Sequence, residues 1–343
     1  MLVCNARVLN NQLTGVPRYL RELISRFGDK VELIRPRRPR EGINGHLWEQ
    51  TVLPLLVGKR VLWSPATTGP LVARRQVVTI HDMVPFDHPE WLNSRFADWY
   101  RFLTPRLVRR VQSILVVSEF TKRRLIHHCP AAEPKINVVL LAADSRFAPL
   151  DSASILAAHK ALSIPSPHYL LALGSLEPRK NLGRLLLAWA QMEAKIPQDV
   201  WLVIAGGMGK KLTFGNMSFE KLPPRVHLTG RVADNLLPAL YSGALGSVYV
   251  SLYEGFGLPP LEAMACGTPV LTSNVASLPE VVGDAAITVD PLNVDAIGDA
   301  IFRIVEDSTL RATLRSAGLA QAGRFNWNET ARATWKVLHE AEG

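Results

Sequence analysis

Residues 251–269 read SLYEGFGLPPLEAMACGTP, and the rest of the chain can be interpreted around them. The preceding run, GSVYVS at residues 246–251, is short and mostly apolar, which predicts a buried strand. Residues 261–266 predict the start of a helix, which the glycine that follows can end. The stretch therefore places a glycine-rich turn and two acids, Glu254 and Glu262, around the junction of a strand and a helix.

A strand, a loop and a helix N-terminus form a common ligand-binding arrangement. The free amides and the helix dipole favour a bound anion, and ligands of open α/β sheets bind at the carboxyl ends of the strands. Each acid also has an ordinary explanation, because an acid in the first helical turn offsets the dipole and a loop acid is usually solvated. Few structural requirements place both around a glycine turn and the pair Pro259-Pro260, so we treat the stretch as a candidate site.

Length and composition indicate a soluble globular enzyme. The 343 residues are enough for two domains, and hydrophobic and charged contents are 48% and 20%. The three cysteines lack metal-ligand spacing, and their odd number suits a reducing compartment. We expect no signal peptide, and no apolar run approaches the roughly 18–20 residues that span a bilayer. These features predict a cytoplasmic protein whose membrane contact, if any, is peripheral.

The positive charge is concentrated in the first half of the chain. Residues 1–150 contain 23 Lys and Arg against 12 Asp and Glu, whereas the remainder has 16 against 18. The basic clusters are Arg35–Arg40, Lys59-Arg60, Arg74-Arg75, Arg106 with Arg109-Arg110, and Lys122–Arg124. Such a surface can meet anionic lipid head groups at the inner face of the cytoplasmic membrane, or it can simply be solvated. Nucleic acid is not expected as a partner, because no known binding motif accompanies the charge.

Apolar segments typical of strands and of helices alternate along both halves. Strands are expected at residues 1–8, 61–63, 76–80, 113–117, 138–141, 169–173, 200–205, 225–228, 268–272 and 286–290. Helices are expected at residues 15–27, 182–192, 233–242, 294–306 and 327–341. This alternation predicts two doubly wound α/β domains with parallel sheets. A linker is expected between Pro149 and Pro167, and a cleft where the carboxyl edges of the two sheets face each other.

Three further positions have residue types that suit a ligand. Gly15 stands at a strand-to-helix turn, where it allows close approach of a ligand or is a plain turn glycine. His81 follows the strand at 76–80, where a neutral imidazole can accept a hydroxyl proton or can be a structural strand cap. Arg179 and Lys180 precede a helix that Asn181 is expected to cap. Together they form a site suited to a diphosphate, or else a solvated basic loop.

A dinucleotide-dependent oxidoreductase is disfavoured. That class requires G-x-G-x-x-G after the first strand, where this chain has NNQLTG at residues 10–15. The run GGMGKK at residues 206–211 lacks the last glycine of the pattern.

Residues 254–270, EGFGLPPLEAMACGTPV, resemble the E-x7-E signature of the family-4 retaining glycosyltransferases, which have the GT-B fold. The resemblance covers nearly the whole chain. Supporting matches lie at residues 14–19 (TGVPRY), 80–82 (IHD), 117–120 (VSEF), 174–182 (GSLEPRKNL), 277–283 (SLPEVVG) and 325–327 (FNW). It implies two Rossmann-like domains that face each other across a cleft. Residues 1–160 would form the acceptor-side domain, residues 161–328 the nucleotide-sugar domain, and residues 329–343 a helix that packs back on the first domain.

The resemblance also assigns roles to residues of the second half. It implies that Glu254 contacts the hydroxyls of the donor sugar and that Glu262 hydrogen-bonds the ribose of the nucleotide. Arg179 and Lys180 would hold the diphosphate, and backbone amides near Gly257 would assist them.

Further donor contacts follow from the same resemblance, at Leu258 and at the strand end Gly174-Ser175. Some members of the family have an arginine where this chain has Ser175, so one phosphate contact is either missing or supplied elsewhere. From the first half, His81 would face the reacting centre and Gly15 would let its loop approach the donor.

The resemblance implies a retaining, metal-independent glycosyltransferase that needs no cofactor besides its nucleotide-sugar co-substrate. GDP-mannose is the favoured donor, because residues 81–91, HDMVPFDHPEW, resemble mannosyltransferases of bacterial surface-polysaccharide and lipopolysaccharide assembly. The acceptor would be a saccharide or a lipid-linked saccharide. A UDP-sugar donor, a non-catalytic nucleotide-sugar-binding relative and an epimerase of the same fold remain alternatives.

Overall fold

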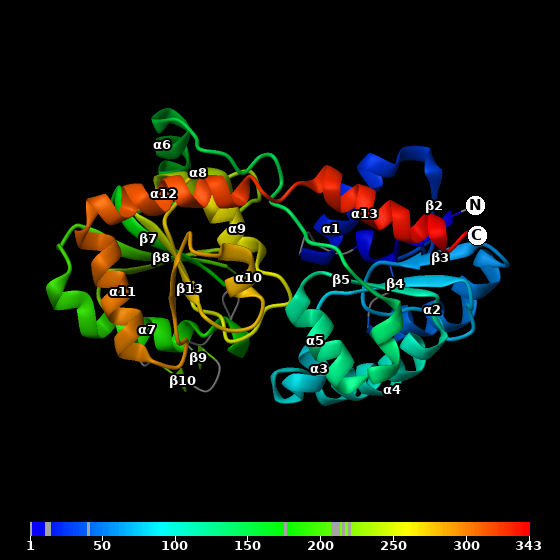
Figure 1. Ribbon diagram of the computed structural model, residues 1–343. Helices are drawn as coiled ribbons and strands as arrows, with labels where there is room; N and C mark the ends of the chain where they lie inside the picture. Colours follow the sequence, from blue (N-terminus) through cyan, green and yellow to red (C-terminus); the bar gives the residue numbers. More distant parts are fainter. Residues whose placement is uncertain are drawn as a thin grey trace. The chain divides into compact units, whose positions relative to one another are not determined.

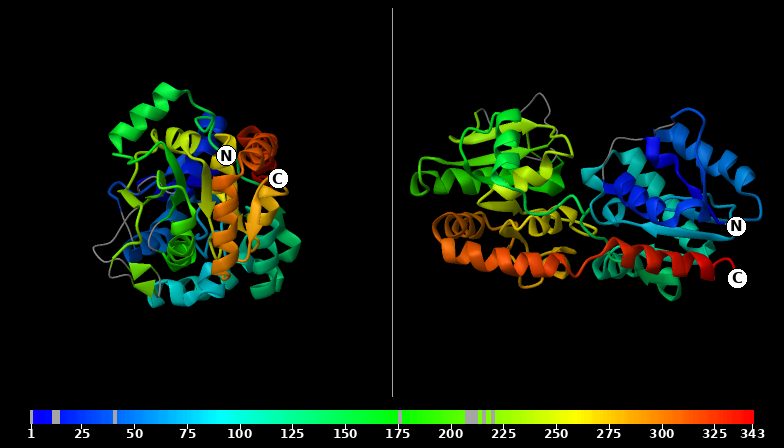
Figure 2. Two further views of the ribbon diagram at one scale, coloured as in Figure 1. Left: turned by 90° about the vertical axis from the view of Figure 1, so that its left-hand side faces the viewer. Right: turned by 90° about the horizontal axis from the view of Figure 1, so that it is seen from above.

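The computed structural model describes residues 2–10, 15–39, 42–174, 177–206, 213–214, 217–218 and 221–343 (Figure 1). The chain divides into two units. Unit 1 contains Met1–Ala142 and Asn326–Gly343, and unit 2 contains Ala143–Phe325. Each unit has one parallel six-stranded sheet with helices on both faces (Figure 2). The α/β class expected from the sequence is confirmed.

Unit 1 has the strand order β2-β1-β3-β4-β5-β6. Its strands are β1 (Leu2–Asn5), β2 (Val31–Ile34), β3 (Val61–Ser64), β4 (Gln76–Ile80), β5 (Ser113–Val116) and β6 (Ile136–Val138). Its α-helices are α1 (Gly15–Phe27), α2 (Gly42–Val57), α3 (Val84–Asp87), α4 (Ser94–Arg110), α5 (Glu119–His128) and α13 (Trp327–Glu340). Short 3₁₀ helices are η1 (Arg7–Asn10), η2 (Gly28–Lys30), η3 (Pro89–Trp91) and η4 (Pro130–Lys135).

Alternating side chains of the unit 1 strands cover the two faces of its sheet. On β4, Val78 and Ile80 pack into an apolar cluster with α4 and α5. Thr79 points to the opposite face, where its hydroxyl lies 3.2 Å from the Tyr19 hydroxyl of α1 and accepts a hydrogen bond from the Trp63 indole. This period-2 pattern is the one expected for a strand buried on both faces.

Helix α13 is far from unit 1 in sequence but packs on α1. Arg26 Nε donates to Asn328 Oδ1 at 2.9 Å, and the rings of Phe27 and Trp335 lie 5.3 Å apart. Thr330 Oγ1 also donates to the carbonyl of Leu140. The helix expected at residues 327–341 therefore forms, and it covers the same face of the sheet as α1.

Unit 2 has the strand order β11-β8-β7-β12-β13-β14. These strands are β7 (His168–Leu173), β8 (Val200–Ala205), β11 (Val226–Gly230), β12 (Gly246–Tyr249), β13 (Val270–Ser273) and β14 (Ile287–Val289), with a separate hairpin of β9 (Thr213–Phe214) and β10 (Met217–Ser218). The α-helices are α6 (Ser152–Ala161), α7 (Leu182–Met192), α8 (Leu237–Gly243), α9 (Leu258–Ala265), α10 (Leu278–Val282), α11 (Val294–Glu306) and α12 (Ser308–Ala322). Two 3₁₀ helices are η5 (Pro178–Lys180) and η6 (Glu193–Lys195).

The segment expected to be a linker, Pro149 to Pro167, contains helix α6. Asp151 caps this helix, because its side chain accepts a hydrogen bond from the Ser154 amide at 2.8 Å. The helix packs against α8, so it belongs to unit 2. The division therefore falls before Ala143 and not after residue 160 as the sequence suggested.

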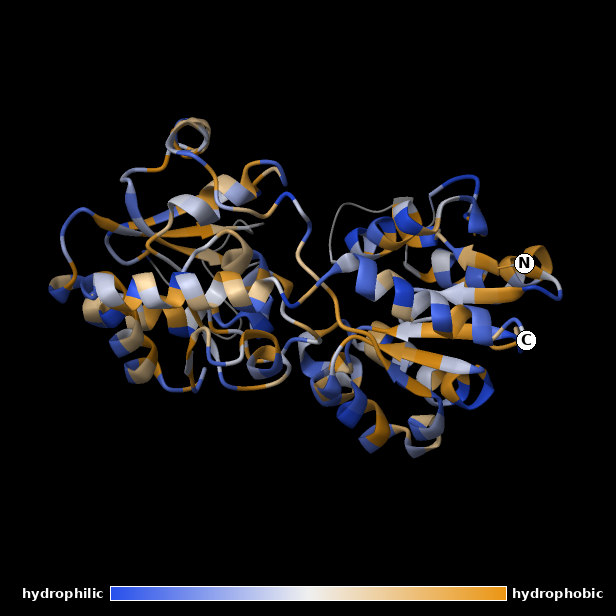
Figure 3. Cartoon of the chain, turned by 45° about the horizontal axis from the view of Figure 1, so that its top comes forward, coloured by the Kyte–Doolittle hydropathy of each residue, from blue (hydrophilic) through white to orange (hydrophobic). Residues whose placement is uncertain are grey.

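Each sheet has a point at which its strand order reverses, and we call this the reversal point of the unit. In unit 2 this point lies between β7 and β12, and in unit 1 it lies between β1 and β3. Loops at the carboxyl ends of the two strands diverge there and leave a crevice, which is where open α/β sheets bind ligands. Figure 3 shows that the strands on either side are largely hydrophobic, so polar groups at these points stand out from their surroundings.

The helix of the 251–269 stretch begins earlier than expected. Gly257, with φ 116°, is the residue before α9, and this left-handed conformation favours glycine. Leu258, Pro259 and Pro260 form the first turn, where proline is tolerated because its missing amide has no helical partner. The expected start at residue 261 was wrong, and Glu262 lies in the second turn.

No helix of the described ranges is both long enough and apolar enough to cross a membrane.

The ends of β7 and β8 approach so closely that Gly206 has no space for a side chain. Its amide donates to the Gly230 carbonyl, and a Cβ atom would lie 1.8 Å from the Gly174 carbonyl oxygen. We expect Gly206→Ala to destabilise unit 2 by ~3 kcal/mol, since backbone must move to relieve the contact. Thermal unfolding measures this, with Gly323→Ala as control because its nearest contacts would be at 3.5 Å. An equal melting temperature for both variants would contradict the close approach.

Candidate functional site

The carboxylate of Glu254 lies at the reversal point of unit 2 and accepts four hydrogen bonds. Oε1 accepts from Lys180 Nζ, from the Tyr249 hydroxyl and from Ser251 Oγ, each at 2.8 Å. Oε2 accepts from Arg179 Nη1 at 3.0 Å. The structure therefore brings together Arg179, Lys180 and Glu254, three of the expected site residues.

The two cations keep protons that the described contacts do not use. Lys180 donates to Glu254 and to the Tyr249 hydroxyl, which uses two of its three protons. Arg179 donates Nε–H to Glu177 and one Nη1–H to Glu254, which leaves three of its five. The site thus carries two positive charges against the buried carboxylate of Glu254 and the exposed carboxylate of Glu177, and it has donors available for an anion.

Burial alone would raise the pKa of the Glu254 carboxyl. The charges of Lys180 and Arg179, with hydrogen bonds from Lys180 and Ser251, outweigh burial and hold this pKa at about 2. Burial lowers the pKa of Lys180, and Glu254 opposes that effect. The Glu254 carboxylate is therefore ionised at neutral pH and binds the cations next to it.

Backbone contacts fix the loop after β7 against the loop after β12. The Arg179 carbonyl accepts from the Leu252 amide at 2.7 Å, and it lies 2.8 Å from Ser251 Oγ, whose single proton it shares with Glu254 Oε1. Asn181, expected as a helix N-cap, makes no capping bond. It has φ 55°, and its amide group donates instead to the carbonyls of Val250 and Pro291. Asn181 therefore ties three loops together, which is a role that the sequence did not predict.

The second glutamate of the signature is buried inside unit 2. Glu262 is 3% exposed, on α9. Burial, reinforced by the Glu262 charge, raises the pKa of the nearby Cys266 thiol to about 12. Ser277 Oγ lies 2.9 Å from the Glu254 carbonyl oxygen and 2.6 Å from that of Phe256, and the two share its single proton, which holds the glycine turn in front of α9.

Other expected donor positions lie around the same point. Gly174 directly follows β7, and a Cβ atom there would be 3.4 Å from the Lys180 Cβ. Leu258 begins α9 after Gly257. Ser175 lies outside the described residues, as does most of the glycine-rich run at 206–211. Gly15 begins α1 in unit 1, with no atom within 4 Å of a hypothetical Cβ.

His81 follows β4 in unit 1. Its Nε2 lies 2.7 Å from the Pro65 carbonyl oxygen, and its ring contacts Tyr19 edge-on at 4.9 Å. Desolvation lowers the pKa of His81 to about 4, against the opposing effect of the Pro65 carbonyl. The neutral ring must therefore donate from Nε2, which leaves Nδ1 as an acceptor.

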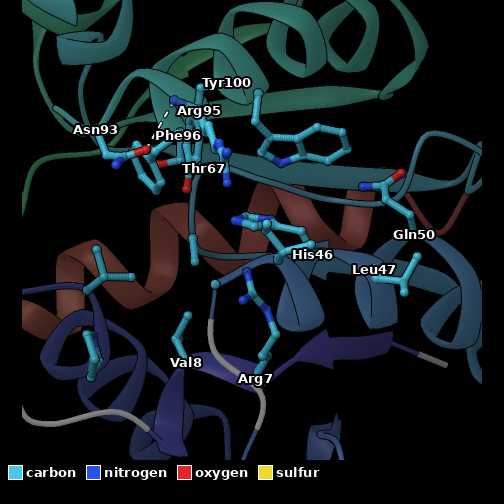
Figure 4. Close-up of a pocket in the computed structure, with 16 residues that line it drawn as sticks. Arg7, Val8, His46, Leu47, Gln50, Thr67, Asn93, Arg95, Phe96 and Tyr100 are labelled. Atoms are coloured by element: carbon cyan, nitrogen blue, oxygen red, sulfur yellow. Dashed lines mark hydrogen bonds between the residues drawn. The ribbon is translucent and has the colours of Figure 1, made fainter. Parts of the chain in front are cut away.

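Unit 1 has a cavity of about 910 Å³ at its own reversal point (Figure 4). The β1 and β3 ends contribute Arg7 and Thr67, while α2 and α4 contribute His46 and Trp99. Further lining residues include Leu47, Gln50, Asn93, Arg95, Phe96 and Tyr100. Among the described residues, three buried lining atoms have no hydrogen-bond partner: Arg7 Nε, His46 Nδ1 and Trp99 Nε1. Aromatic faces beside such groups suit a small polar ligand with apolar edges.

The sequence did not identify this cavity or the Tyr249 hydroxyl. Tyr249 belongs to a strand that was expected to be apolar and buried. A buried tyrosine hydroxyl needs a hydrogen-bond partner, so the sequence did contain a signal for a polar group here. The cavity has no comparable signal, because α2 and α4 were not expected.

No group of three His, Cys, Asp or Glu side chains within the described ranges is arranged to hold a metal ion.

Two family models match the chain. The model described as "Glycosyl transferases group 1" covers residues 156–321, and the one described as "Glycosyltransferase Family 4" covers residues 62–146.

Curated relatives and solved structures agree with these models. O-antigen chain mannosyltransferase B of Escherichia coli is 36% identical over 265 residues, which is 76% of this chain and 69% of that protein. The serotype-specific mannosyltransferase WbdA of Escherichia coli is 29% identical over 75% of this chain, but the match spans only 32% of its length. Anabaena Alr3699/HepE, crystallised with UDP and glucose, superposes with a TM-score of 0.77 at 18% identity and 99% coverage of both chains. The fold is therefore that of the GT-B glycosyltransferases.

The ionised Glu254 predicts a pH dependence of stability. Its pKa is about 2 in the folded protein against an ordinary value of 4.5 for a glutamate side chain, so its contribution to stability is complete above pH ~5 and is lost as pH falls toward 2. We expect Glu254→Gln to lower the free energy of unfolding by ~3 kcal/mol at neutral pH. The difference in unfolding free energy between this variant and the natural protein should shrink as the pH falls from ~5 toward 2. Thermal unfolding between pH 7 and pH 3 measures it.

Glu340→Gln, at an exposed position, is the matched control, and we expect it to change the free energy of unfolding by less than ~0.5 kcal/mol. A Glu254→Gln difference that stays constant with pH would show that the carboxylate charge does not stabilise the fold.

Proposed function

Because the chain belongs to the family-4 glycosyltransferases, we propose that it transfers a sugar from a nucleotide sugar to a saccharide acceptor with retention at the anomeric carbon. The observation that supports this most directly is the pair of cations around Glu254, at the reversal point of the unit 2 sheet. Two positive charges with unused protons suit a diphosphate, which is the group that leaves when a nucleotide sugar reacts.

In the proposed reaction the bond between the anomeric carbon and the diphosphate oxygen breaks. Negative charge grows on the diphosphate, and Arg179, Lys180 and the amides at Gly257 and Leu258 stabilise it. A bond forms from the acceptor oxygen to the anomeric carbon on the same face, through an oxocarbenium-like state. The acceptor proton passes to the leaving phosphate oxygen. No metal ion is required for these steps, since the two side-chain cations carry the compensating charge.

Glu254 is proposed to have two tasks. It orients Arg179 and Lys180, and it contacts the hydroxyls of the donor sugar. A carboxylate offers about four acceptor positions and all four have partners here, so contact with the sugar requires the exchange of one. The diphosphate can drive this exchange because it competes for the same cations. Glu262 is proposed to bind the ribose.

The cavity of unit 1 is proposed to bind the acceptor saccharide. The faces of Trp99, Phe96 and Tyr100 suit the C–H edges of a sugar ring, and the unpartnered atoms of Arg7 and His46 suit its hydroxyls. His81 is proposed to receive a hydrogen bond from a hydroxyl near the reacting centre through Nδ1.

Mannose from GDP-mannose is the proposed sugar, and surface-polysaccharide assembly the proposed process. The support is the similarity to mannosyltransferases of O-antigen chains. The acceptor then is a saccharide or a lipid-linked saccharide.

Donor binding is tested by thermal shift with nucleoside diphosphates and nucleotide sugars, since a ligand stabilises the state that binds it. We expect GDP and GDP-mannose to give the largest shifts, and Lys180→Ala to lower both the shift and the transfer rate, the latter by ~10²–10³-fold. The exposed Lys195→Ala is the control. Transfer should persist in EDTA. Full activity of Lys180→Ala would refute the site, and a larger shift with UDP would refute the choice of donor.

Acceptor binding is tested by Trp99→Ala, which removes an aromatic face from the unit 1 cavity. We expect the KM for acceptor to rise ~10-fold, while the thermal shift caused by GDP stays unchanged because that site is in unit 2. Phe302→Ala, at an exposed aromatic of α11, is the control. An unchanged acceptor KM would place the acceptor elsewhere.

A further inference from the structure

A residue with a left-handed backbone conformation lines the unit 1 cavity. Thr67, in the loop between β3 and β4, has φ 63°. Among the non-glycine residues with positive φ in the described ranges it is the β-branched one, the others being Ser163, Asn181, Arg225 and Ala276. A branch at Cβ makes this conformation especially unfavourable, so glycine is the residue expected there. A threonine that keeps it indicates that the side chain has a function at this place.

The turn around Thr67 is also of a strained type. The Thr68 amide donates to the Ala66 carbonyl at 2.7 Å, which closes a three-residue turn with Thr67 at its centre. A γ-turn with positive φ at its central residue is the rarer and more strained of the two forms. The Thr67 amide donates to the Thr79 carbonyl of β4 at 2.8 Å, so the strained residue is bound directly to the sheet.

A buried carboxylate holds the other side of this turn. The Thr68 hydroxyl donates to Glu49 Oε2 of α2 at 3.1 Å, and both residues are buried. The same oxygen accepts from Asn5 Nδ2 at 2.9 Å and lies 3.4 Å from Arg7 Nη2. Glu49 thus joins the loop after β3 to the end of β1 and to α2, and all three line the cavity. Relaxation of the turn would break these contacts, so the position of Thr67 is fixed before a ligand binds.

The Thr67 hydroxyl has a proton to offer to a ligand. Thr67 is one of the residues that line the cavity (Figure 4). Its Oγ1 accepts a long hydrogen bond, 3.4 Å, from the His81 amide. The hydroxyl proton has no acceptor within the part of the chain that the structure describes. A donor on a rigid turn therefore stands at the cavity wall beside the His81 backbone.

Such a donor suits the selection of one hydroxyl group on a sugar. A sugar ring has several hydroxyls of similar reactivity, and it holds adjacent ones at a fixed spacing. A hydrogen bond to one of them therefore determines where the next one lies. A hydroxyl on a mobile loop would select poorly, whereas one on a turn fixed by packing and hydrogen bonds keeps a single position.

We propose that Thr67 selects the acceptor hydroxyl that is glycosylated. The Thr67 hydroxyl donates a hydrogen bond to the sugar hydroxyl next to the attacking one, and the attacking hydroxyl then lies beside His81. During transfer the attacking oxygen forms the bond to the anomeric carbon, and its proton passes to the leaving phosphate oxygen. Thr67 keeps its own proton throughout. This inference rests on the proposed function, because it concerns the acceptor of that reaction.

Substitution of Thr67 by glycine separates selection from folding. The assay uses the nucleotide sugar that stabilises the chain most and the octyl glycoside, of mannose, galactose, glucose or N-acetylglucosamine, that the natural chain glycosylates best. Thr67→Gly removes the hydroxyl and suits the left-handed backbone, so we expect an equal or higher melting temperature. We also expect kcat/KM for the acceptor to fall ~10-fold or more and the product to contain more than one linkage. A residue with a structural role alone would not combine these results.

Two further variants and a set of acceptors identify the hydroxyl as the cause. Thr67→Ser keeps the hydroxyl and should keep the natural linkage, whereas Thr67→Val keeps the shape and should lose selection as Thr67→Gly does. Monodeoxy derivatives of the chosen acceptor give the matching measurement from the ligand side. The derivative that lacks the selected neighbour should be a poor acceptor for the natural chain, and Thr67→Gly should cause no further loss with it.

Ser163→Gly is the matched control, because Ser163 is also a hydroxyl residue with positive φ, 51°, and belongs to unit 2. It should change neither kcat/KM nor linkage, and the thermal shift caused by the donor should be natural in every variant. Natural kcat/KM and a single natural linkage in Thr67→Gly would overturn this inference and leave the proposed function intact. Absence of transfer by the natural chain to every one of the glycosides would overturn both.

Discussion

The arrangement of unit 2 depends on one buried carboxylate. An ionised Glu254 away from water would be costly, and the cost is offset by two cations and two hydroxyl groups that all converge on it. Two of these donors follow β7 and the others belong to β12 or directly follow it. The carboxylate therefore joins the carboxyl ends of two neighbouring strands whose onward chains turn away from each other. The compensation of one buried charge therefore gathers two cations at this edge of the sheet.

Local sequence was sufficient to find the parts of this site. The spacing of Glu254 and Glu262, the glycine turn between them and two cations before a helix are features of short segments, and each forms at its expected place. Their assembly was not predictable from those segments. Arg179 and Glu254 are 75 residues apart and meet because β7 and β12 are neighbours in the sheet, and strand order is a property of the whole unit. The expected cap at Asn181 failed for the same reason, since distant carbonyls compete for its side chain.

Two of the helices that the sequence missed were hidden for different physical reasons. Helix α2 lacks the amphipathic period that reveals a surface helix, because its outward face is also apolar. Helix α6 was hidden by prolines on either side, which indicated a linker although they lie outside the helix. The basic clusters were visible as clusters, but only packing shows that three of them, Lys59-Arg60, Arg74-Arg75 and Arg109-Arg110, surround the connection between β3 and β4. Hydrophobic periodicity predicts segments that are polar on one side, and it does not reveal a helix that is apolar on both sides.

The position of α13 determines the order in which the two units can mature during synthesis. Unit 1 needs α13 to cover Tyr19 and Phe27, yet α13 leaves the ribosome after every residue of unit 2. Unit 2 is contiguous in sequence, so it can complete its core before α13 is made. During that time one face of the sheet formed by the first 142 residues lacks this helix. Unit 1 is thus synthesised first but completes its fold last. A chain that stops before α13 would expose aromatic surface of unit 1, to which holding chaperones bind.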